Sequence, residues 1–205
     1  MHALIVVAHP ESGSLSHGIA AAVGQGIAGS GGCHDFEIAD LAAEGFDPRF
    51  TDADLAVHRK QAAPPADVAF EQARIDRADT LVLVYPVYWW SMPALMKGWI
   101  DRVFANGWAF DFGLQTGLTK KLRHLRVHLV AVAGADMRTY ARHGYFGAMK
   151  TQIEHGIFDY CGATVVRSEI LFESETQSPQ AHLDAARAIG RKVSASMPCE
   201  QAKAA

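Results

Sequence analysis

The sequence predicts an α/β fold in which a parallel sheet of five strands lies between two layers of helices. Short continuous apolar runs, which are typical of strands buried on both faces, recur at 3–8, 79–85, 125–133 and 164–171. Helical patterns fill the intervals between these runs. An alternation of strands and helices along a whole chain is typical of a parallel sheet with helices packed on both faces.

The remaining elements follow from local patterns. A weaker apolar run at 33–39 supplies the second strand, and residues 41–66 form the longest irregular stretch. Helices are expected at 16–28, 67–77, 93–104, 146–160 and 179–196. Five strand–helix units in 205 residues predict the flavodoxin-like version of the doubly wound fold, a three-layer sandwich with strand order 2-1-3-4-5.

Length and composition predict one soluble domain over residues 1–198, with a loose C-terminal tail at 199–205. Hydrophobic residues make up 49% of the chain and charged residues 20%, which argues against disorder and coiled-coil repeats. The formal net charge of −3 offers no basic excess for a nucleic acid or an anionic membrane surface. We therefore expect no nucleic-acid partner.

The sequence also predicts a cytoplasmic location. The N-terminus lacks the basic region of a signal peptide, and no apolar run approaches the roughly 18 residues of a membrane span, so we expect no membrane insertion. Cys33, Cys161 and Cys199 form no C-x-x-C pair, which indicates neither a disulfide framework nor a zinc ribbon. His124 and His128 lie on a predicted strand about 13 Å apart, so we expect no metal site.

Ligands of open parallel sheets bind beyond the carboxyl ends of the strands, where the strand order reverses. This rule selects the segments 9–16, 86–93 and 134–145. In the first segment, His9, Ser14 and Ser16 lie at a helix start, where unpaired N–H groups and the helix dipole favour a phosphate. The alternative is that a serine merely caps the helix and that His9 is an ordinary histidine.

The second segment contains Tyr88, Trp89 and Trp90 at the point where the sheet opens. Adjacent tryptophans are rarely left to solvent, so a flat aromatic ligand or a subunit interface explains them, and core packing is the alternative. The helix at 93–104 is apolar on two stripes. One stripe would pack on the sheet and the other on a second subunit, which predicts a homodimer. The G-x-G-x-x-G pattern at 24–29 falls near a helix end, where it indicates a helix stop and no dinucleotide site.

Residues 85–104 closely resemble the signature of the NAD(P)H:quinone oxidoreductase family, a flavodoxin-like group that includes DT-diaphorase. The start at 4–10 is similar to the first strand and phosphate turn of that family. Phe46-Asp47-Pro48 with Asp54 resembles its loop after the second strand. The likeness covers residues 3 to 165.

The resemblance implies a two-electron reductase in which NAD(P)H delivers hydride to flavin N5, leaves, and is replaced in the same pocket by a quinone. It implies a phosphate-side site, an isoalloxazine-edge site that includes the backbone after the fourth strand, and a substrate contact. The phosphate side is matched by His9, Ser14, Leu15 and Ser16. The isoalloxazine edge is matched by Pro86, Val87, Tyr88, Trp89, Ala133, Gly134 and Ala135, and the substrate contact by Trp90.

The third segment departs from the family pattern. Residues 132–135 read Val-Ala-Gly-Ala where family members have Thr-Thr-Gly-Gly, so two hydroxyls near the flavin pyrimidine are missing. Tyr140 matches the catalytic-site tyrosine, but its partner histidine is replaced by Phe146. Tyr140 and His143 are therefore the candidate proton relay, with Tyr145 as an alternative partner and a packing role as the alternative for Tyr140.

The resemblance leaves the cofactor and the role open. The loop at 46–48 favours FAD, whereas FMN-binding ancillary subunits of potassium-efflux systems are similar around Trp89 and residues 107–110. An alternative function is therefore a flavin-binding regulatory subunit of such a transporter. A nitro- or azo-reductase would use the same pocket and the same hydride chemistry.

Overall fold

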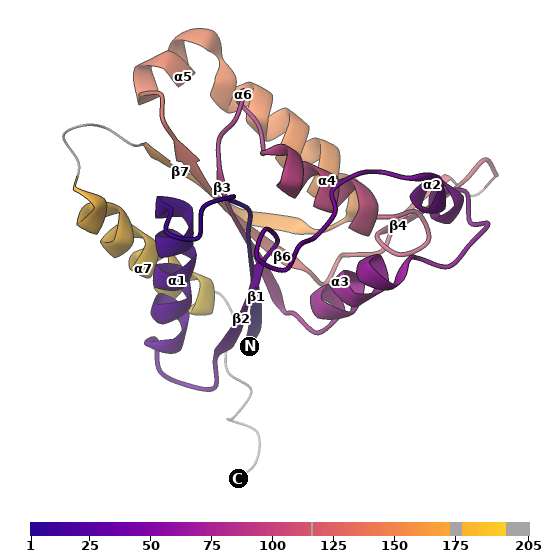
Figure 1. Ribbon diagram of the computed structural model, residues 1–205, viewed down its shortest axis with the longest axis horizontal. Helices are drawn as coiled ribbons and strands as arrows, with labels where there is room; N and C mark the ends of the chain where they lie inside the picture. Colours follow the sequence, from indigo (N-terminus) through magenta and orange to yellow (C-terminus); the bar gives the residue numbers. More distant parts are fainter. Residues whose placement is uncertain (116, 173–177, 196–205) are drawn as a thin grey trace.

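The computed structural model describes residues 1–115, 117–172 and 178–195 (Figure 1), so the expected tail at 199–205 lies outside the described residues. Its main sheet has five strands in the order β2-β1-β3-β6-β7, all of them parallel. These are β1 (His2–Val7), β2 (Asp35–Asp40), β3 (Thr80–Pro86), β6 (Arg126–Ala133) and β7 (Thr164–Phe172). Because β6 and β7 are the fourth and fifth strands of this sheet along the chain, the predicted order 2-1-3-4-5 is confirmed.

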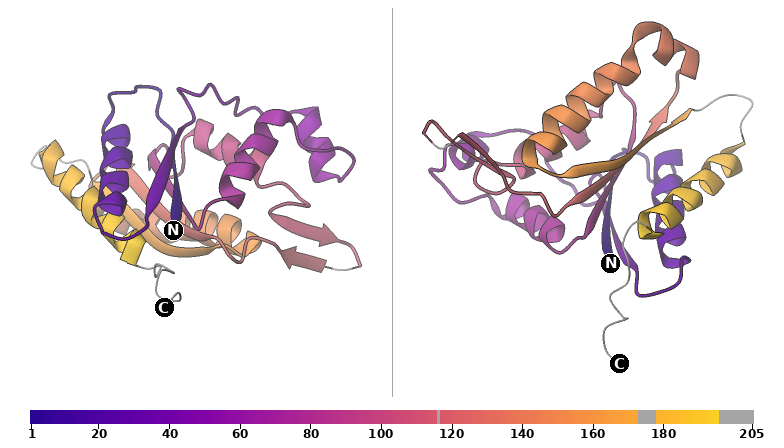
Figure 2. Two further views of the ribbon diagram at one scale, coloured as in Figure 1. Left: turned by 90° about the horizontal axis from the view of Figure 1, so that it is seen from below. Right: turned by 180° about the vertical axis from the view of Figure 1, so that it is seen from behind.

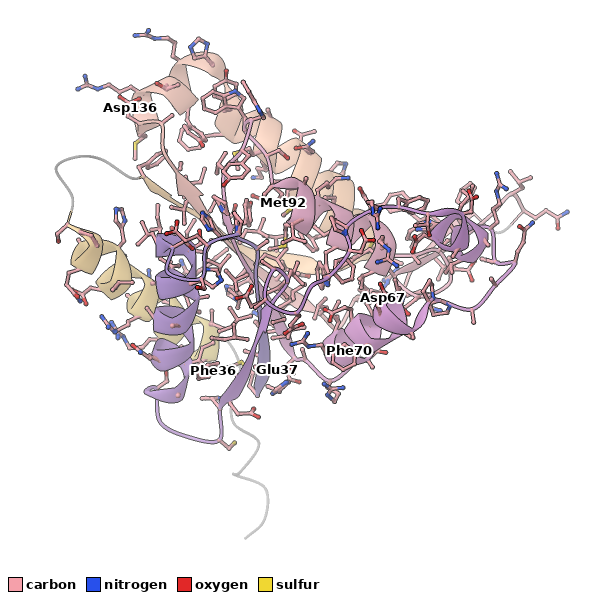
Figure 3. All side chains as sticks on the ribbon, in the orientation of Figure 1. Phe36, Glu37, Asp67, Phe70, Met92 and Asp136 are labelled. Atoms are coloured by element: carbon pink, nitrogen blue, oxygen red, sulfur yellow. The ribbon has the colours of Figure 1, made fainter. Side chains whose placement is uncertain are left out.

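Helices cover both faces of the sheet, and each face has its own apolar core (Figure 1). On one face lie α1 (Leu15–Ala28) and α7 (Pro179–Ala195), and on the other lie α3 (Ala66–Asp76), α4 (Ala94–Val103) and η1 (Lys150–Asp159). Neighbouring side chains of β2 show this division, because Phe36 points towards α1 and Glu37 towards α3 (Figure 3).

Four features differ from the sequence prediction. The stretch 41–66 contains α2 (Asp52–His58), which begins with a capping box between Thr51 and Asp54. An antiparallel hairpin of β4 (Phe110–Gly113) and β5 (Gly117–Lys120) projects from the body of the molecule (Figure 2). The segment 134–145 after the fourth strand, where no helix was expected, contains α5 (Met137–His143). The predicted helix at 146–160 is divided into α6 (Tyr145–Met149) and the π-helical η1.

The glycines of the G-x-G-x-x-G pattern belong to α1 and to its contact with α7. A Cβ atom at Gly26 would lie 2.2 Å from the backbone oxygen of Arg187, and one at Gly190 would lie 2.1 Å from that of Val23. Gly29 is the C-cap residue of α1. The pattern therefore ends a helix and lets two helices approach closely, as the prediction of a helix stop requires.

Helix α4 corrects the argument for a second subunit. Both apolar stripes expected on it are turned into the protomer, where Met96, Trp99, Ile100 and Val103 are all buried. The indole Nε1 of Trp99 donates a hydrogen bond of 2.8 Å to Glu71 on α3, which fixes α4 against its neighbour. This helix gives no support for a dimer, because its apolar residues are already covered within one chain.

The cysteines also differ from expectation. Cys33 is disulfide-bonded, which the cysteine spacing did not indicate. Cys161 is free and buried, and burial raises the pKa of its thiol to about 11. Within the described ranges, no helix is long and apolar enough to cross a membrane.

Candidate functional site

The three segments selected from the sequence meet at the carboxyl ends of β1, β3 and β6. Two adjoining hollows lie there, and Val87 and Gly134 line both of them. The first has a volume of about 310 Å³ and is lined by His9, Leu15, Ser16, Pro86, Val87, Tyr88, Val132 and Gly134. The second has a volume of about 170 Å³ and is lined by Val87, Trp89, Trp90, Gly134, Ala135 and Tyr140.

A tight turn after β3 lines both hollows. The backbone N–H groups of Tyr88 and Ser91 each donate to the carbonyl of the other, at 3.0 Å in both directions. Between them Trp89 and Trp90 have φ angles of 50° and 61°, in the left-handed region that bulky side chains rarely adopt. Such strain is concentrated at ligand-binding sites. Trp89 is 93% exposed, so core packing does not explain this turn.

Trp90 belongs to a cluster of aromatic rings behind the second hollow. Its indole is stacked on Tyr145, with ring centroids 3.7 Å apart and planes inclined by 11°. Tyr140 meets Trp90 edge-on at 5.4 Å and also contacts Tyr145 and Phe172. The cluster joins the turn after β3 to α5 and to the end of β7, so it holds Trp90 in one orientation.

Tyr140 is buried, and burial raises the pKa of its phenol above the ordinary value. The hydroxyl therefore keeps its proton at neutral pH and can act as a hydrogen-bond donor. His143 is exposed in the last turn of α5, and its ring lies 5.5 Å from that of Tyr145. Phe146, at the position of the family histidine, contacts the ring of Tyr140 at 5.4 Å. The role of His143 in a relay stays a prediction.

At the first turn, the structure adds residues that sequence reasoning missed. Ser14 is the N-cap of α1, and its hydroxyl accepts from the backbone N–H of His17. The same hydroxyl lies 2.8 Å from Nδ1 of His17, whose Nε2 lies 2.9 Å from Asp40 at the end of β2. Ser16 and Leu15 line the hollow, whereas the Ser14 side chain is directed at His17.

Two further predictions have a different placement. Ala133 is buried in β6 and lines neither hollow, so any contribution from it is through the backbone. The loop at 46–48 lies against α4, where a Cβ at Gly98 would be 2.3 Å from the Pro48 carbonyl oxygen. The guanidinium of Arg102 lies over the Phe46 ring and donates to the Asp47 carbonyl. This loop therefore has a packing role, and its placement does not favour FAD over FMN.

Comparison with known proteins identifies the family of this chain. A family model described as a flavodoxin-like fold matches residues 1–193. Human ribosyldihydronicotinamide dehydrogenase (quinone) is 31% identical over 199 residues, which cover 86% of this chain and 84% of the human protein. The chain belongs to the flavodoxin-like NAD(P)H:quinone oxidoreductase family. It is therefore an oxidoreductase.

Two further comparisons extend the family relationship to microbial proteins. An uncharacterized NAD(P)H oxidoreductase of Haemophilus influenzae is 31% identical over 173 residues, which cover 83% of each chain. The solved structure of NAD(P)H:quinone oxidoreductase from Methanothermobacter marburgensis superposes with a TM-score of 0.84 at 27% identity, covering 94% of this chain and 98% of that one.

The group that this family implies is a flavin, and the residues present fit one. An ideal Cβ built on Gly134 would meet no atom within 4 Å, so the missing side chain leaves open space where the two hollows join. Aromatic side chains wall the smaller hollow, and the start of α1 adjoins the larger one. A flat ring with a phosphate-bearing chain matches this pairing of an apolar slot with a helix start.

Further hollows lie elsewhere in the described part of the chain. One, of about 620 Å³, lies between residues 57–64 and 106–108, a second, of about 350 Å³, lies between η1 and the strands β6 and β7, and a third, of about 300 Å³, lies between η1 and the start of β7. These three are not lined by the turn at 88–91 or by the start of α1. The rule that ligands bind where strand order reverses therefore selects the paired hollows at Val87 and Gly134.

Proposed function

We propose that this protein is a flavin-dependent NAD(P)H:quinone oxidoreductase that transfers two electrons as hydride in a ping-pong reaction. The observation that carries the proposal is the pair of hollows that meet at Gly134, one at the start of α1 and one walled by Trp90 and Tyr140. When bound, the flavin supplies hydride chemistry at N5, and the protein supplies binding, orientation and charge stabilisation.

The residues around the hollows have separate tasks in this proposal. His9, Ser16 and the backbone N–H groups at the start of α1 hold the phosphate side of the cofactor. The turn at 88–91 and the backbone around Gly134 border the ring. The two hydrogen bonds within the turn join Tyr88 and Ser91, so the backbone N–H groups of Trp89 and Trp90 are available to the cofactor. Tyr140 donates a hydrogen bond to charge that develops at the reacting end.

The ping-pong order is proposed from the family resemblance. With the flavin ring bound, the nicotinamide and the quinone would stack on it in turn beside Trp90 and Tyr140. We propose FAD as the cofactor on the sequence resemblance of residues 46–48 alone, with FMN as the alternative, because the packing of these residues against α4 does not distinguish the two flavins. We also propose a homodimer, for which the exposed apolar hairpin provides the surface.

The test is an absorbance spectrum of the purified protein after loading with FAD or FMN, followed by anaerobic addition of NADPH or NADH and then a quinone. A flavin spectrum that bleaches with the nicotinamide and returns with quinone is the expected result. Flavin that resists both reductants would favour the regulatory subunit of a potassium-efflux transporter, which should also co-purify with a membrane protein. Failure to bind either flavin would overturn the proposal.

The same preparation distinguishes the nitro- and azo-reductase alternatives. A quinone, a nitroaromatic and an azo dye accept hydride in the same pocket, so the comparison is between their kcat/KM values with a common reductant. We expect the quinone to have the highest value. A higher value for either of the other two acceptors would replace the quinone in the proposed function.

A further inference from the structure

A serine, a histidine and a carboxylate form one hydrogen-bonded chain beside the proposed phosphate site. The Ser14 hydroxyl lies 2.8 Å from Nδ1 of His17, and Nε2 of His17 lies 2.9 Å from Oδ2 of Asp40. The side chains of His17 and Asp40 are only 16% and 22% exposed, so solvent competes weakly for these bonds. These bonds link the first turn of α1 to the end of β2, and of the three residues only Ser14 was predicted from the sequence.

At the Asp40 end of this series of hydrogen bonds, the position of one proton is fixed. An ionised carboxylate only accepts hydrogen bonds, so Nε2 of His17 carries a proton in either charge state of the ring. Asp40 itself is held in place, because its Oδ1 accepts from the backbone N–H groups of Ala42 and Ala43 at 3.2 Å each. The charge state of His17 is therefore decided at Nδ1, which faces Ser14.

The direction of the bond between Ser14 and His17 depends on that charge state. When Nδ1 is unprotonated, the Ser14 hydroxyl must donate its only proton to the ring. When Nδ1 is protonated, the ring donates and the Ser14 proton is free to bind an anionic oxygen. An anion at this turn favours the second state, both through attraction to the imidazolium and through the extra hydrogen bond.

We propose that His17 is a positioning residue that takes up a proton when the cofactor phosphate binds, and so turns the Ser14 hydroxyl from the ring towards the phosphate. This inference rests on the proposed function, because it needs a phosphate-bearing flavin at the start of α1. The consequence is that phosphate-bearing flavins bind more tightly as the pH falls, whereas the ring portion gains nothing from His17.

The other charged groups near His17 define the competing explanation. From the preceding turn, His9 lies with its ring 6.2 Å from that of His17, and Glu11 contacts His9 through its backbone. Helix α7, which packs along α1, carries the buried His182 and the ion pair of Arg187 with Asp184, and the Arg187 guanidinium is also bonded to Gln25 of α1. His9 is the group that could take up the proton instead, so the experiment must separate it from His17.

The test measures the number of protons taken up per bound flavin, from calorimetric titrations at about pH 7.5 in buffers of different ionisation enthalpy. The probes are FAD, FMN and riboflavin, and both phosphate groups are largely ionised at this pH. We expect uptake of up to about one proton with FAD and FMN, and none with riboflavin. Linkage then requires the Kd for FAD to rise with pH, by at most about tenfold per unit.

Variants assign the proton to its residue. His17→Gln should abolish the uptake, while His155→Gln on the exposed face of η1, a matched control, should keep it. Asp40→Asn retains the oxygen that accepts from Ala42 and Ala43 and should reduce the uptake, which gives a second variant if His17→Gln does not fold. His9→Gln should leave uptake in place even where it weakens binding.

The outcomes separate this inference from the proposed function. Binding of FAD or FMN without proton uptake, or uptake that survives His17→Gln and disappears in His9→Gln, would overturn the role of His17 and leave the flavin reductase standing. A wild-type protein that binds neither flavin would overturn both. Uptake that is abolished in His17→Gln, reduced in Asp40→Asn and kept in the His9 and His155 variants would establish the positioning role.

Discussion

The buried hydroxyl of Tyr140 is the group in the site whose chemistry depends most on a single atom. Its ring is held by Trp90, Tyr145 and Phe172, so Tyr140→Phe removes the hydroxyl and leaves the packing unchanged. If the hydroxyl stabilises developing charge, the variant should slow the hydride half-reactions by roughly 10²-fold. Stopped-flow absorbance of the flavin measures both half-reactions directly.

The control for Tyr140→Phe is its flavin affinity and unfolding free energy, which should change little because the aromatic contacts remain. His143→Ala is the companion variant, and it slows the same steps only if His143 is the relay partner. Unchanged rates in Tyr140→Phe would remove Tyr140 from the chemistry and leave it a packing residue. Unchanged rates in His143→Ala alone would point to Tyr145 as the partner.

His128 predicts a pH dependence of stability that has nothing to do with the site. It is buried in β6, and neither ring nitrogen has a hydrogen-bond partner in the described part of the chain. Burial, with a smaller effect of Arg126 and Arg167, lowers its pKa from 6.5 to about 4. The unfolded chain therefore binds more protons between these values, so His128 destabilises the fold as pH falls through this window.

The variant that tests this pH dependence is His128→Leu, which replaces the imidazole by an apolar side chain of similar size among the apolar neighbours of β6. Urea unfolding of both proteins at pH 7.5 and pH 4 gives the difference in unfolding free energy. We expect that difference to move in favour of the variant by about 3 kcal/mol between the two pH values. Parallel losses of stability in both proteins would show that carboxylates, and not His128, govern the acid limb.

At the scale of elements, the contact between α1 and α7 depends on two glycines that face each other. A methyl group at Gly190 would lie 2.1 Å from a backbone oxygen of α1, and backbone cannot move aside as a side chain can. Gly190→Ala should lower the unfolding free energy by about 2 kcal/mol, since the helices must separate. Gly147→Ala is the matched control, because a Cβ there meets nothing within 4 Å and should stabilise α6 by about 0.5 kcal/mol.

These elements also show where sequence reasoning succeeds. Buried parallel strands are continuous apolar runs, so β1, β3, β6 and β7 were predicted within about two residues of their observed ends. The hairpin β4–β5 was missed because each strand has only four residues, too few for a clear alternation. Helix α2 was missed because only Asp54 and Val57 are buried in it, although its capping box was a readable signal.

At the scale of the whole molecule, the site was predictable to the extent that it follows from topology. Because parallel strands end at the same edge of a sheet, segments after β1, β3 and β6 had to meet, and the structure brings most of the predicted residues around two hollows. The link from His17 to Asp40 was not predictable. It joins residues 23 apart in sequence, and only the pairing of β1 with β2 brings them together.

The surface of the whole molecule predicts its assembly. The hairpin that projects from the body (Figure 2) carries Phe112 and Leu118, with Leu114 98% exposed at its turn, and Tyr160 lies beside it against Phe110. Monomeric proteins rarely leave such apolar groups together in solvent, so we expect a dimer at micromolar concentration by light scattering. Phe112→Ser with Leu114→Ser should produce a monomer, whereas Phe70→Ser, at a 58% exposed position on α3, should not. A wild-type monomer would remove the dimer from the proposal. The apolar stripes of α4 are already buried within one chain, so the hairpin carries the argument for a dimer.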